Sequence, residues 1–146
     1  MAIDKKATLT YVQLMKEDLA VFRLVPEDGI IPDYEAGQFI TVGMPIPSED
    51  NKVVRRAYSM ASHPENKRFI ELVVRWVRRP LPGRVTTALF NSGEGDEVSW
   101  IPPTGVALKI NEKMGDGTKD DRRIVCVSGG TGIAPFMSFA RHLRAI

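Results

Sequence analysis

The chain has 146 residues, which is the size of one ordinary domain or of one domain with part of another. With 43% hydrophobic and 26% charged residues, it has enough apolar side chains for a core and enough polar ones for a surface. The formal net charge of +2, from 20 basic and 18 acidic residues, gives no reason to expect a nucleic acid or a membrane as partner.

Cysteine and histidine are scarce. Cys126 is the single cysteine, which excludes an internal disulfide and a cysteine-ligated iron–sulfur cluster within this chain. With two histidines and no Cys/His cluster, we expect no metal site. The first 13 residues lack the apolar core of a signal peptide, and no apolar run is long enough to span a membrane, so the expected location is the cytoplasm.

Up to about residue 110 the pattern predicts strands. Six segments are rich in β-branched and aromatic residues or alternate between apolar and polar residues, at residues 7–18, 19–28, 37–47, 53–62, 69–79 and 96–102. One helix is expected between residues 82 and 93, because Val85, Ala88 and Leu89 repeat at helical spacing and Gly93 can end it. The sequence therefore predicts a mainly β domain, an antiparallel six-stranded barrel or sandwich with one helix.

The last part of the chain has a different character. Residues 111–121 contain two glycines and no apolar periodicity, which indicates a linker. Residues 122–128 contain a continuous apolar run at 124–127, as in a buried parallel strand, and we expect Cys126 within it to be a buried, inert thiol. A helix should follow, with an apolar stripe formed by Ile133, Phe136, Met137, Ala140 and Leu143.

A strand, a glycine turn and a helix are typical of the start of an α/β domain. One strand and one helix cannot cover an α/β sheet on both faces. We therefore expect residues 122–146 to be the truncated beginning of such a domain.

Three pieces of the chain carry candidate chemistry. The glycine-rich turn at residues 129–132 exposes backbone N–H groups at a helix start, which suits either an anion or a tight strand–helix turn, and Pro135 replaces the third glycine of a dinucleotide fingerprint. Thr86, in the first turn of the other helix, suits either a cap or a phosphate contact. In the segment 53–62, alternation directs Arg56 and Tyr58 to one face and Ser59 to the other.

Taken together, five motifs resemble the ferredoxin–NADP+ reductase superfamily. They are AGQFITV (36–42), RAYSMAS (56–62), PGRVTTALFNSGEGDEV (82–98), IPPTG (101–105) and VSGGTGIAPF (127–136). The resemblance runs from about residue 36 to the C-terminus. It implies an FAD-binding β-barrel domain at residues 1–110, a linker at 111–121 and the N-terminal fragment of an NAD(P)-binding domain at 122–146.

The resemblance also implies roles for single residues. Arg56 would bind the flavin phosphate, Tyr58 would stack on the flavin ring, and Ser59 would bond near its reactive N5 edge, so Tyr58 and Ser59 are the catalytic candidates. The remaining cofactor-binding candidates fall into three groups: Gly83, Arg84, Val85 and Thr86 for the pyrophosphate, Val73 and Val74 for the ribityl and adenosine, and Gly130, Thr131, Gly132 and Pro135 for NAD(P).

The function implied is that of a flavin-dependent reductase that uses FAD and NADP or NAD. It would exchange electrons between NAD(P)H and ferredoxin or flavodoxin, and as a truncated chain it is expected to bind flavin better than it catalyses hydride transfer. One alternative keeps the fold and makes the protein the reductase component of an oxygenase, or an electron-transfer subunit of a larger flavoenzyme. A second alternative is a non-catalytic β-barrel binding module without flavin.

Overall fold

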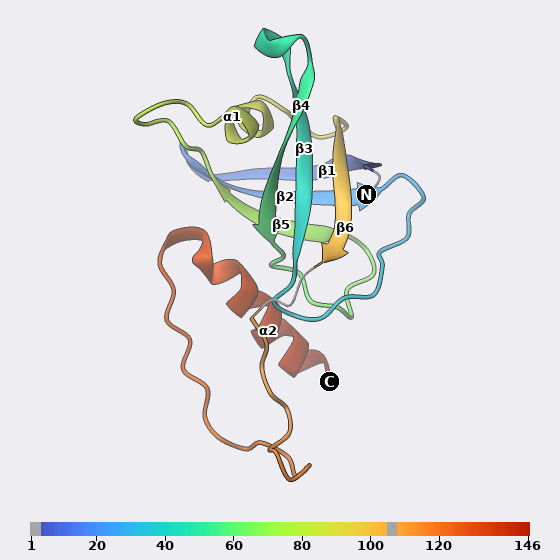
Figure 1. Cartoon of the computed structure of the whole chain (residues 1–146), viewed down its shortest axis with the longest axis vertical. Coiled ribbons are helices and arrows are strands. Elements are labelled where there is room, and N and C mark those ends of the chain that lie inside the picture. The colour runs from blue at the N-terminus through green and yellow to red at the C-terminus, as the bar shows by residue number, and fades with distance from the viewer. Residues whose placement is uncertain (1–3, 105–107) are drawn as a thin grey trace.

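The computed structural model describes residues 4–104 and 108–146. One antiparallel sheet dominates it, with the strands in the order β4-β3-β6-β1-β2-β5 (Figure 1). The strands are β1 (Lys5–Lys16), β2 (Leu19–Pro26), β3 (Phe39–Ile46), β4 (Lys52–Ser59), β5 (Ile70–Arg75) and β6 (Glu97–Thr104). Each of the six segments predicted to be a strand overlaps one of these strands, so the mainly β, six-stranded class is confirmed, although β4 and β5 remain the two edges of a sheet that does not close.

Alternation of side chains explains the sheet. In β2 every second residue is buried, and the whole strand pairs with β1 through the turn at Glu17 and Asp18. The curled, open sheet, which we call the barrel, encloses the core, whose largest fully buried side chains include Trp100, Phe22, Leu9, Leu24, Ile40 and Leu72. Gly105, the last residue of the 101–105 motif, lies outside the described residues.

Helix α1 (Arg84–Phe90) confirms the predicted helix and covers one end of the sheet. It buries Val85 and Leu89 in the core. Phe90 meets Phe22 edge-on at 5.6 Å between ring centroids and stacks on Trp76 at 5.3 Å. Aromatic contacts of this kind add to the area that the rings bury, so they fix the helix against β2 and the end of β5.

The apolar segment 122–128 is not a strand. It runs extended without ladder partners, and Val125 and Val127 are 84% and 85% exposed. Cys126 is exposed too, so its predicted burial is wrong. The physical reason is that a buried parallel strand needs neighbours on both edges and a layer on each face, and the described residues supply neither. Before it, residues 112–120 form a small turn around a bridge between Lys113 and Lys119.

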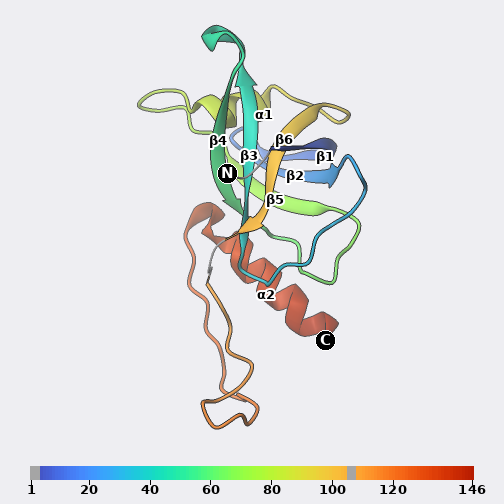
Figure 2. The same cartoon turned by 45° about the vertical axis from the view of Figure 1, so that its right-hand side comes forward.

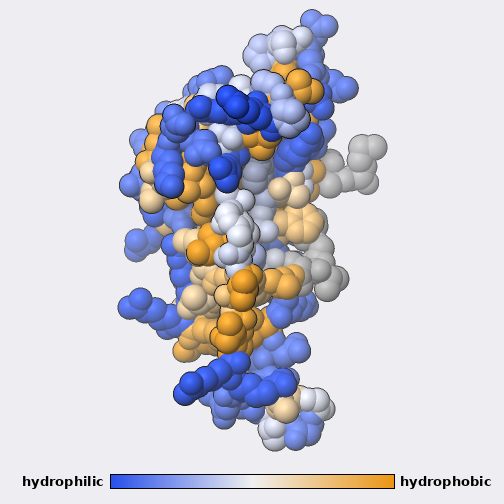
Figure 3. Space-filling view, turned by 90° about the vertical axis from the view of Figure 1, so that its left-hand side faces the viewer, coloured by the Kyte–Doolittle hydropathy of each residue, from blue (hydrophilic) through white to orange (hydrophobic). Residues whose placement is uncertain are grey.

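Helix α2 (Ala134–Ala145) follows a short 3₁₀ turn at Gly130–Ile133. Its buried residues are Ala134, Ser138 and Phe139, whereas Ile133 and Leu143 of the predicted stripe are each 44% exposed. The helix thus turns a mixed polar face to the barrel and leaves its apolar stripe largely outside. Figure 3 shows hydrophobic surface on the side of the molecule where the 122–128 segment and the start of α2 lie.

Helix α2 lies below the sheet, at the end where β4 ends and β5 begins (Figures 1 and 2). Its contact with the barrel requires Gly37, which has a φ of +94°. A Cβ at this position would collide with the backbone carbonyl oxygen of Leu108 and lie 2.7 Å from Cζ of Phe139, so a side chain there would displace both the chain at Leu108 and α2. Within residues 4–104 and 108–146, no helix is long and apolar enough to cross a bilayer.

Candidate functional site

The two edge strands define the candidate site. Arg56, Tyr58 and Ser59 lie on β4, opposite Val42, Ile40 and Phe39 of β3 in the ladder. Val73 and Val74 lie on β5, which pairs with β2 on its other side. The lower ends of the two edges meet, because the Ala61 N–H donates to the Glu71 carbonyl oxygen at 2.8 Å. We call the outer sides of β4 and β5, which have no neighbouring strand in the sheet, the β4–β5 edge.

The two adjacent arginines of β4 have different surroundings. Arg55 forms an ion pair with Asp4, with Nη2 donating to Oδ2 at 2.6 Å and Nε bonding both carboxylate oxygens. Arg56 is exposed and has no acidic partner among the described residues; its Nη1 donates only to the Arg55 carbonyl oxygen, at 2.8 Å. The guanidinium of Arg56 is therefore available to an anionic ligand, and that of Arg55 is already neutralised.

Tyr58 is half-buried and exposes part of its aromatic ring at the β4–β5 edge. The ring packs on the margin of the core, and this burial raises the pKa of the phenol to about 12, against a smaller lowering by the charge of Arg56. The side chain stays neutral at any physiological pH. A neutral, half-covered ring beside an unpaired guanidinium suits a flat ligand that carries phosphate.

The first turn of α1 supplies a second anion-compatible feature. Gly83 precedes the helix in an extended conformation, and no side chain caps the turn. A Cβ at Gly83 would lie 2.6 Å from Oγ1 of Thr86 and 3.0 Å from Cβ of Val77, so only glycine allows this close approach. The first backbone N–H groups of a helix lack partners within it, and here no side chain caps them.

The Thr86 hydroxyl is bonded to the backbone of its own loop and is not free for the predicted contact with a phosphate. Its hydroxyl accepts the Val77 N–H at 3.2 Å and donates to the Gly83 carbonyl oxygen at 3.3 Å, and the residue is 9% exposed. Its observed contacts fix the loop between β5 and α1. Arg84 instead bonds both carboxylate oxygens of Glu49 at 3.0 Å. Val85 and Val74 are buried in the core, so only their backbone can meet a ligand.

The glycine-rich turn lies at the other end of the site. Gly130–Ile133 contacts β5, and α2 begins under the Ser59 end of β4. Gly130 and Gly132 are exposed, whereas Thr131 and Pro135 are half-buried. The fold thus brings the β4 candidates and the turn candidates to one end of the β4–β5 edge and places α1 at the opposite end.

Sequence reasoning missed several residues of this region. Trp76 follows β5, donates its indole N–H to Thr87 Oγ1 at 3.0 Å, and has the guanidinium of Arg78 at 4.1 Å from its ring centroid. A cavity of about 520 Å³ flanks α1 and is lined by Gly83, Arg84 and residues of the β3 end such as Met44 and Ile46. The one available signal was the aromatic residue inside an arginine-rich run; nothing local indicates the cavity.

Comparison with known proteins identifies this arrangement. The family model described as "Oxidoreductase FAD-binding domain" matches residues 6–107. Flavohemoprotein from Bordetella pertussis is 32% identical over 130 residues, which are 88% of this chain and 30% of that protein. Phthalate dioxygenase reductase from Burkholderia cepacia is 33% identical over 131 residues, 88% of this chain and 35% of that protein.

Solved structures agree on the fold. The flavohem-like FAD/NAD-binding domain of nitric oxide dioxygenase from Vibrio cholerae superposes with a TM-score of 0.79 at 25% identity, covering 94% of this chain and 55% of that one. A ferredoxin–NADP+ reductase from Neisseria gonorrhoeae with bound FAD and NADP gives a TM-score of 0.69 at 18% identity, covering 99% and 53%.

The fold is that of an FAD-binding module of oxidoreductases, and it is shared with ferredoxin–NADP+ reductases. The chain belongs to the oxidoreductase FAD-binding domain family. It spans about a third of the length of the relatives compared above.

Proposed function

We propose that this chain holds FAD at the β4–β5 edge, as part of a reductase that takes electrons from NAD(P)H and passes them to a one-electron acceptor. The observation that carries the proposal is the contrast between the two arginines of β4. Arg56 has no acidic partner among the described residues and stands two positions from the half-exposed ring of Tyr58, whereas Arg55 is paired with Asp4.

Each candidate residue has a distinct task in this proposal. Bound FAD accepts a hydride and releases electrons singly, so the protein has to bind and orient it rather than supply an acid or a base. Arg56 binds a phosphate oxygen, Tyr58 covers one face of the ring, and the Ser59 hydroxyl bonds its N5 edge. The Gly83–Val85 backbone binds the second phosphate, with Thr86 holding the loop in place, whereas the guanidinium of Arg84 is engaged by Glu49.

The two anion-compatible features favour FAD over FMN. Arg56 and the uncapped first turn of α1 are separate groups at different places along the edge, and a diphosphate engages both. Val73 and the backbone of Val74 then lie along the chain that joins ring and phosphates. Gly130, Thr131, Gly132 and Pro135, at the Ser59 end, are the proposed approach for the nicotinamide of NADPH or NADH.

Ferredoxin or flavodoxin is the acceptor proposed first. A second candidate is the role of an oxygenase reductase component, favoured by the 33% identity to phthalate dioxygenase reductase and to a reductase component of terephthalate 1,2-dioxygenase from Comamonas. Anaerobic transfer from the reduced, flavin-loaded protein to ferredoxin, flavodoxin or a [2Fe–2S] acceptor protein distinguishes them by rate. The family membership leaves the module without flavin as the least supported alternative.

Titration of the flavin-free chain with FAD and with FMN tests the proposal. We expect tighter binding of FAD, and a loss of affinity of between about 10-fold and 100-fold in Arg56→Ala, because a charge-assisted hydrogen bond contributes about 1.5–3 kcal/mol. Tyr58→Ala should also weaken binding. Arg55→Ala is the matched control, since it removes the same side chain one position away.

The Arg55→Ala control shows whether a loss of FAD affinity is specific to Arg56. Arg55→Ala should leave FAD affinity within about twofold, because its guanidinium is already engaged by Asp4 at a partly exposed ion pair. A chain that fails to bind FAD, or equal losses in Arg55→Ala and Arg56→Ala, would contradict the proposed site.

A further inference from the structure

Helix α2 is joined to the barrel by buried polar contacts. The Ser138 hydroxyl donates to the Ser62 carbonyl oxygen at 2.7 Å, and both serines are 0% exposed. One turn further along the helix, Nη1 of Arg141 donates to the Ala61 carbonyl oxygen at 2.9 Å. Both acceptors lie within three residues of Ser59, the last residue of β4, so α2 is attached directly beyond the end of that strand.

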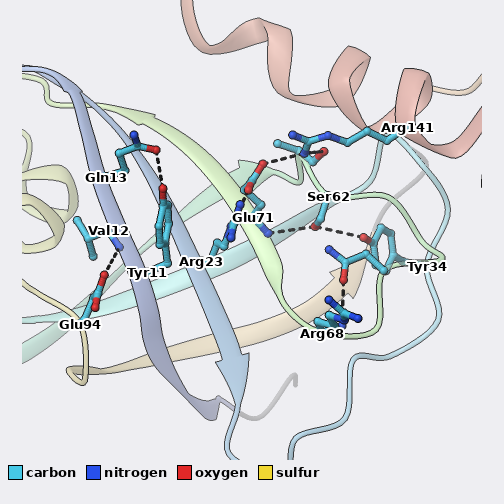
Figure 4. A network of polar contacts seen from close by, with 12 residues as sticks. Tyr11, Val12, Gln13, Arg23, Tyr34, Ser62, Arg68, Glu71, Glu94 and Arg141 are labelled. Atoms are coloured by element: carbon cyan, nitrogen blue, oxygen red, sulfur yellow. Dashed lines mark hydrogen bonds and ion pairs between the residues drawn. The ribbon is translucent and has the colours of Figure 1, made fainter. Parts of the chain in front are cut away.

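Arg141 also reaches a buried carboxylate. Its Nη1 lies 2.7 Å from Oε1 of Glu71, while Nε of Arg23 donates to Oε2 at 2.8 Å (Figure 4). The Glu71 side chain is only 4% exposed. Burial alone would raise the pKa of Glu71, but the hydrogen bonds from Arg141 and Arg23 outweigh it, so the pKa is lowered and the carboxylate is charged. A buried carboxylate of this kind is stable only while its partners stay in place.

The barrel side of this contact is held independently of α2. The Glu71 N–H donates to Ser62 Oγ at 3.0 Å, and Tyr34 donates its hydroxyl to the same oxygen at 3.3 Å. Arg23 is fixed between the rings of Tyr11 and Phe69, at 4.5 and 4.2 Å from their centroids. Loss of Arg141 therefore removes an attachment of the helix and one partner of the Glu71 carboxylate, while Arg23 and the Ser62 hydroxyl still hold Glu71 on the barrel.

The attachment lies close to the glycine-rich turn. Ser138 is just over one helical turn from Ala134, where α2 begins, and the turn Gly130–Ile133 directly precedes Ala134. An α-helix is stiff over this distance, so the angle fixed at Ser138 and Arg141 also fixes the position of the turn relative to Ser59. Sequence motifs indicated the turn and the strand, but not the contacts that fix their relative position.

We propose that Ser138, Arg141 and Glu71 form a docking clamp that positions the Gly129–Gly132 turn at the Ser59 end of the β4–β5 edge. Arg141 is then a positioning residue for electron transfer from the nicotinamide to the flavin. The role in transfer rests on the proposed function, whereas the clamp itself is a property of the protein without flavin.

Hydrogen exchange on the flavin-free chain tests the clamp. In Arg141→Met, which keeps most of the side-chain length, the amides of residues 138–145, which are hydrogen-bonded within α2, should exchange about 10-fold to 100-fold faster, the range expected for a lost charge-assisted hydrogen bond. Amides of β1–β3 should be unchanged, Arg141→Lys should recover part of the protection, and Arg144→Met, an exposed arginine of the same helix, is the control. Unchanged exchange of 138–145, or equal acceleration throughout the barrel, would overturn the proposal.

Reduction of the FAD-loaded protein tests the role in transfer. We expect Arg141→Met to slow reduction by NADPH or NADH at least 10-fold, while FAD affinity and the rate of reduction by dithionite stay the same. Equal slowing with dithionite, or loss of FAD, would show that Arg141 supports the barrel and not the geometry of transfer. If the wild-type protein binds no FAD or is not reduced by either nucleotide, the proposed function fails, and hydrogen exchange still decides the clamp.

Discussion

The Thr86 hydroxyl offers a sharp test, because its position distinguishes support of a loop from direct contact with a phosphate. The residue is 9% exposed and its Oγ1 joins the Val77 N–H to the Gly83 carbonyl oxygen. Thr86→Val keeps the shape and removes both bonds. We expect a loss in the free energy of unfolding of about 1–2 kcal/mol, since the Val77 N–H loses its acceptor in a partly buried place.

Thermal unfolding of the flavin-free chain measures this loss. At about 4 °C per kcal/mol for a chain of this size, the Tm should fall by about 4–8 °C. Thr86→Ser, which keeps the hydroxyl, should lose much less. Thr87→Val is the neighbouring control, because its Oγ1 accepts only the indole N–H of the half-exposed Trp76, which water can replace. If Thr86→Val leaves the Tm of the flavin-free chain unchanged but lowers FAD affinity, the hydroxyl binds the flavin and the reasoning is refuted.

Two further predictions concern the C-terminal part. Both ring nitrogens of His142 face carboxylates, Nδ1 toward Glu65 at 2.5 Å and Nε2 toward Glu112 at 2.9 Å, and the hydrogen bond to Glu112 and that to Glu65 raise its pKa despite partial burial. A group with a raised pKa stabilises the fold fully below the pKa of the unfolded chain and loses that stabilisation as the pH rises through the folded value. The unfolding free energy should therefore fall as the pH rises above about 6.5, the ordinary pKa of histidine, and should fall less in His142→Gln. An equal pH dependence in both proteins would contradict this. Cys126 is exposed, so a thiol reagent should modify it in the native protein at nearly the rate found in denaturant, whereas a need for denaturant would mean that the segment is covered.

Local patterns predicted what local forces determine. Alternation and β-branched residues located all six strands, and the spacing of Val85 and Leu89 located α1, because each face meets the core in the same way along its length. The segment 122–128 misled for the same reason. A continuously apolar run looks the same whether or not other strands cover it, and its burial depends on neighbours rather than on the run itself.

Side-chain partners far apart in sequence were beyond such reasoning. The motif at 56–62 and the turn at 129–132 were predicted, but the bond between Arg141 and Glu71 joins residues 70 positions apart, and no periodicity encodes it. Similarly, the sequence pointed to Arg56 as the phosphate ligand, but it did not indicate that Asp4 neutralises the neighbouring Arg55. Topology creates these pairs, and it also decided that α2 turns Ser138 rather than Leu143 toward the barrel.

The docking of α2 has a consequence for how interchangeable such modules are. Two of its acceptors are backbone carbonyl oxygens, those of Ala61 and Ser62, which every amino acid provides. The helix donates to these two acceptors from a serine and an arginine three positions apart, a spacing that places both on one face. A chimera that grafts a foreign nucleotide-binding module onto this barrel therefore has to preserve that pair of residues, a partner for Glu65 such as His142, and the small space above Gly37 that Phe139 occupies.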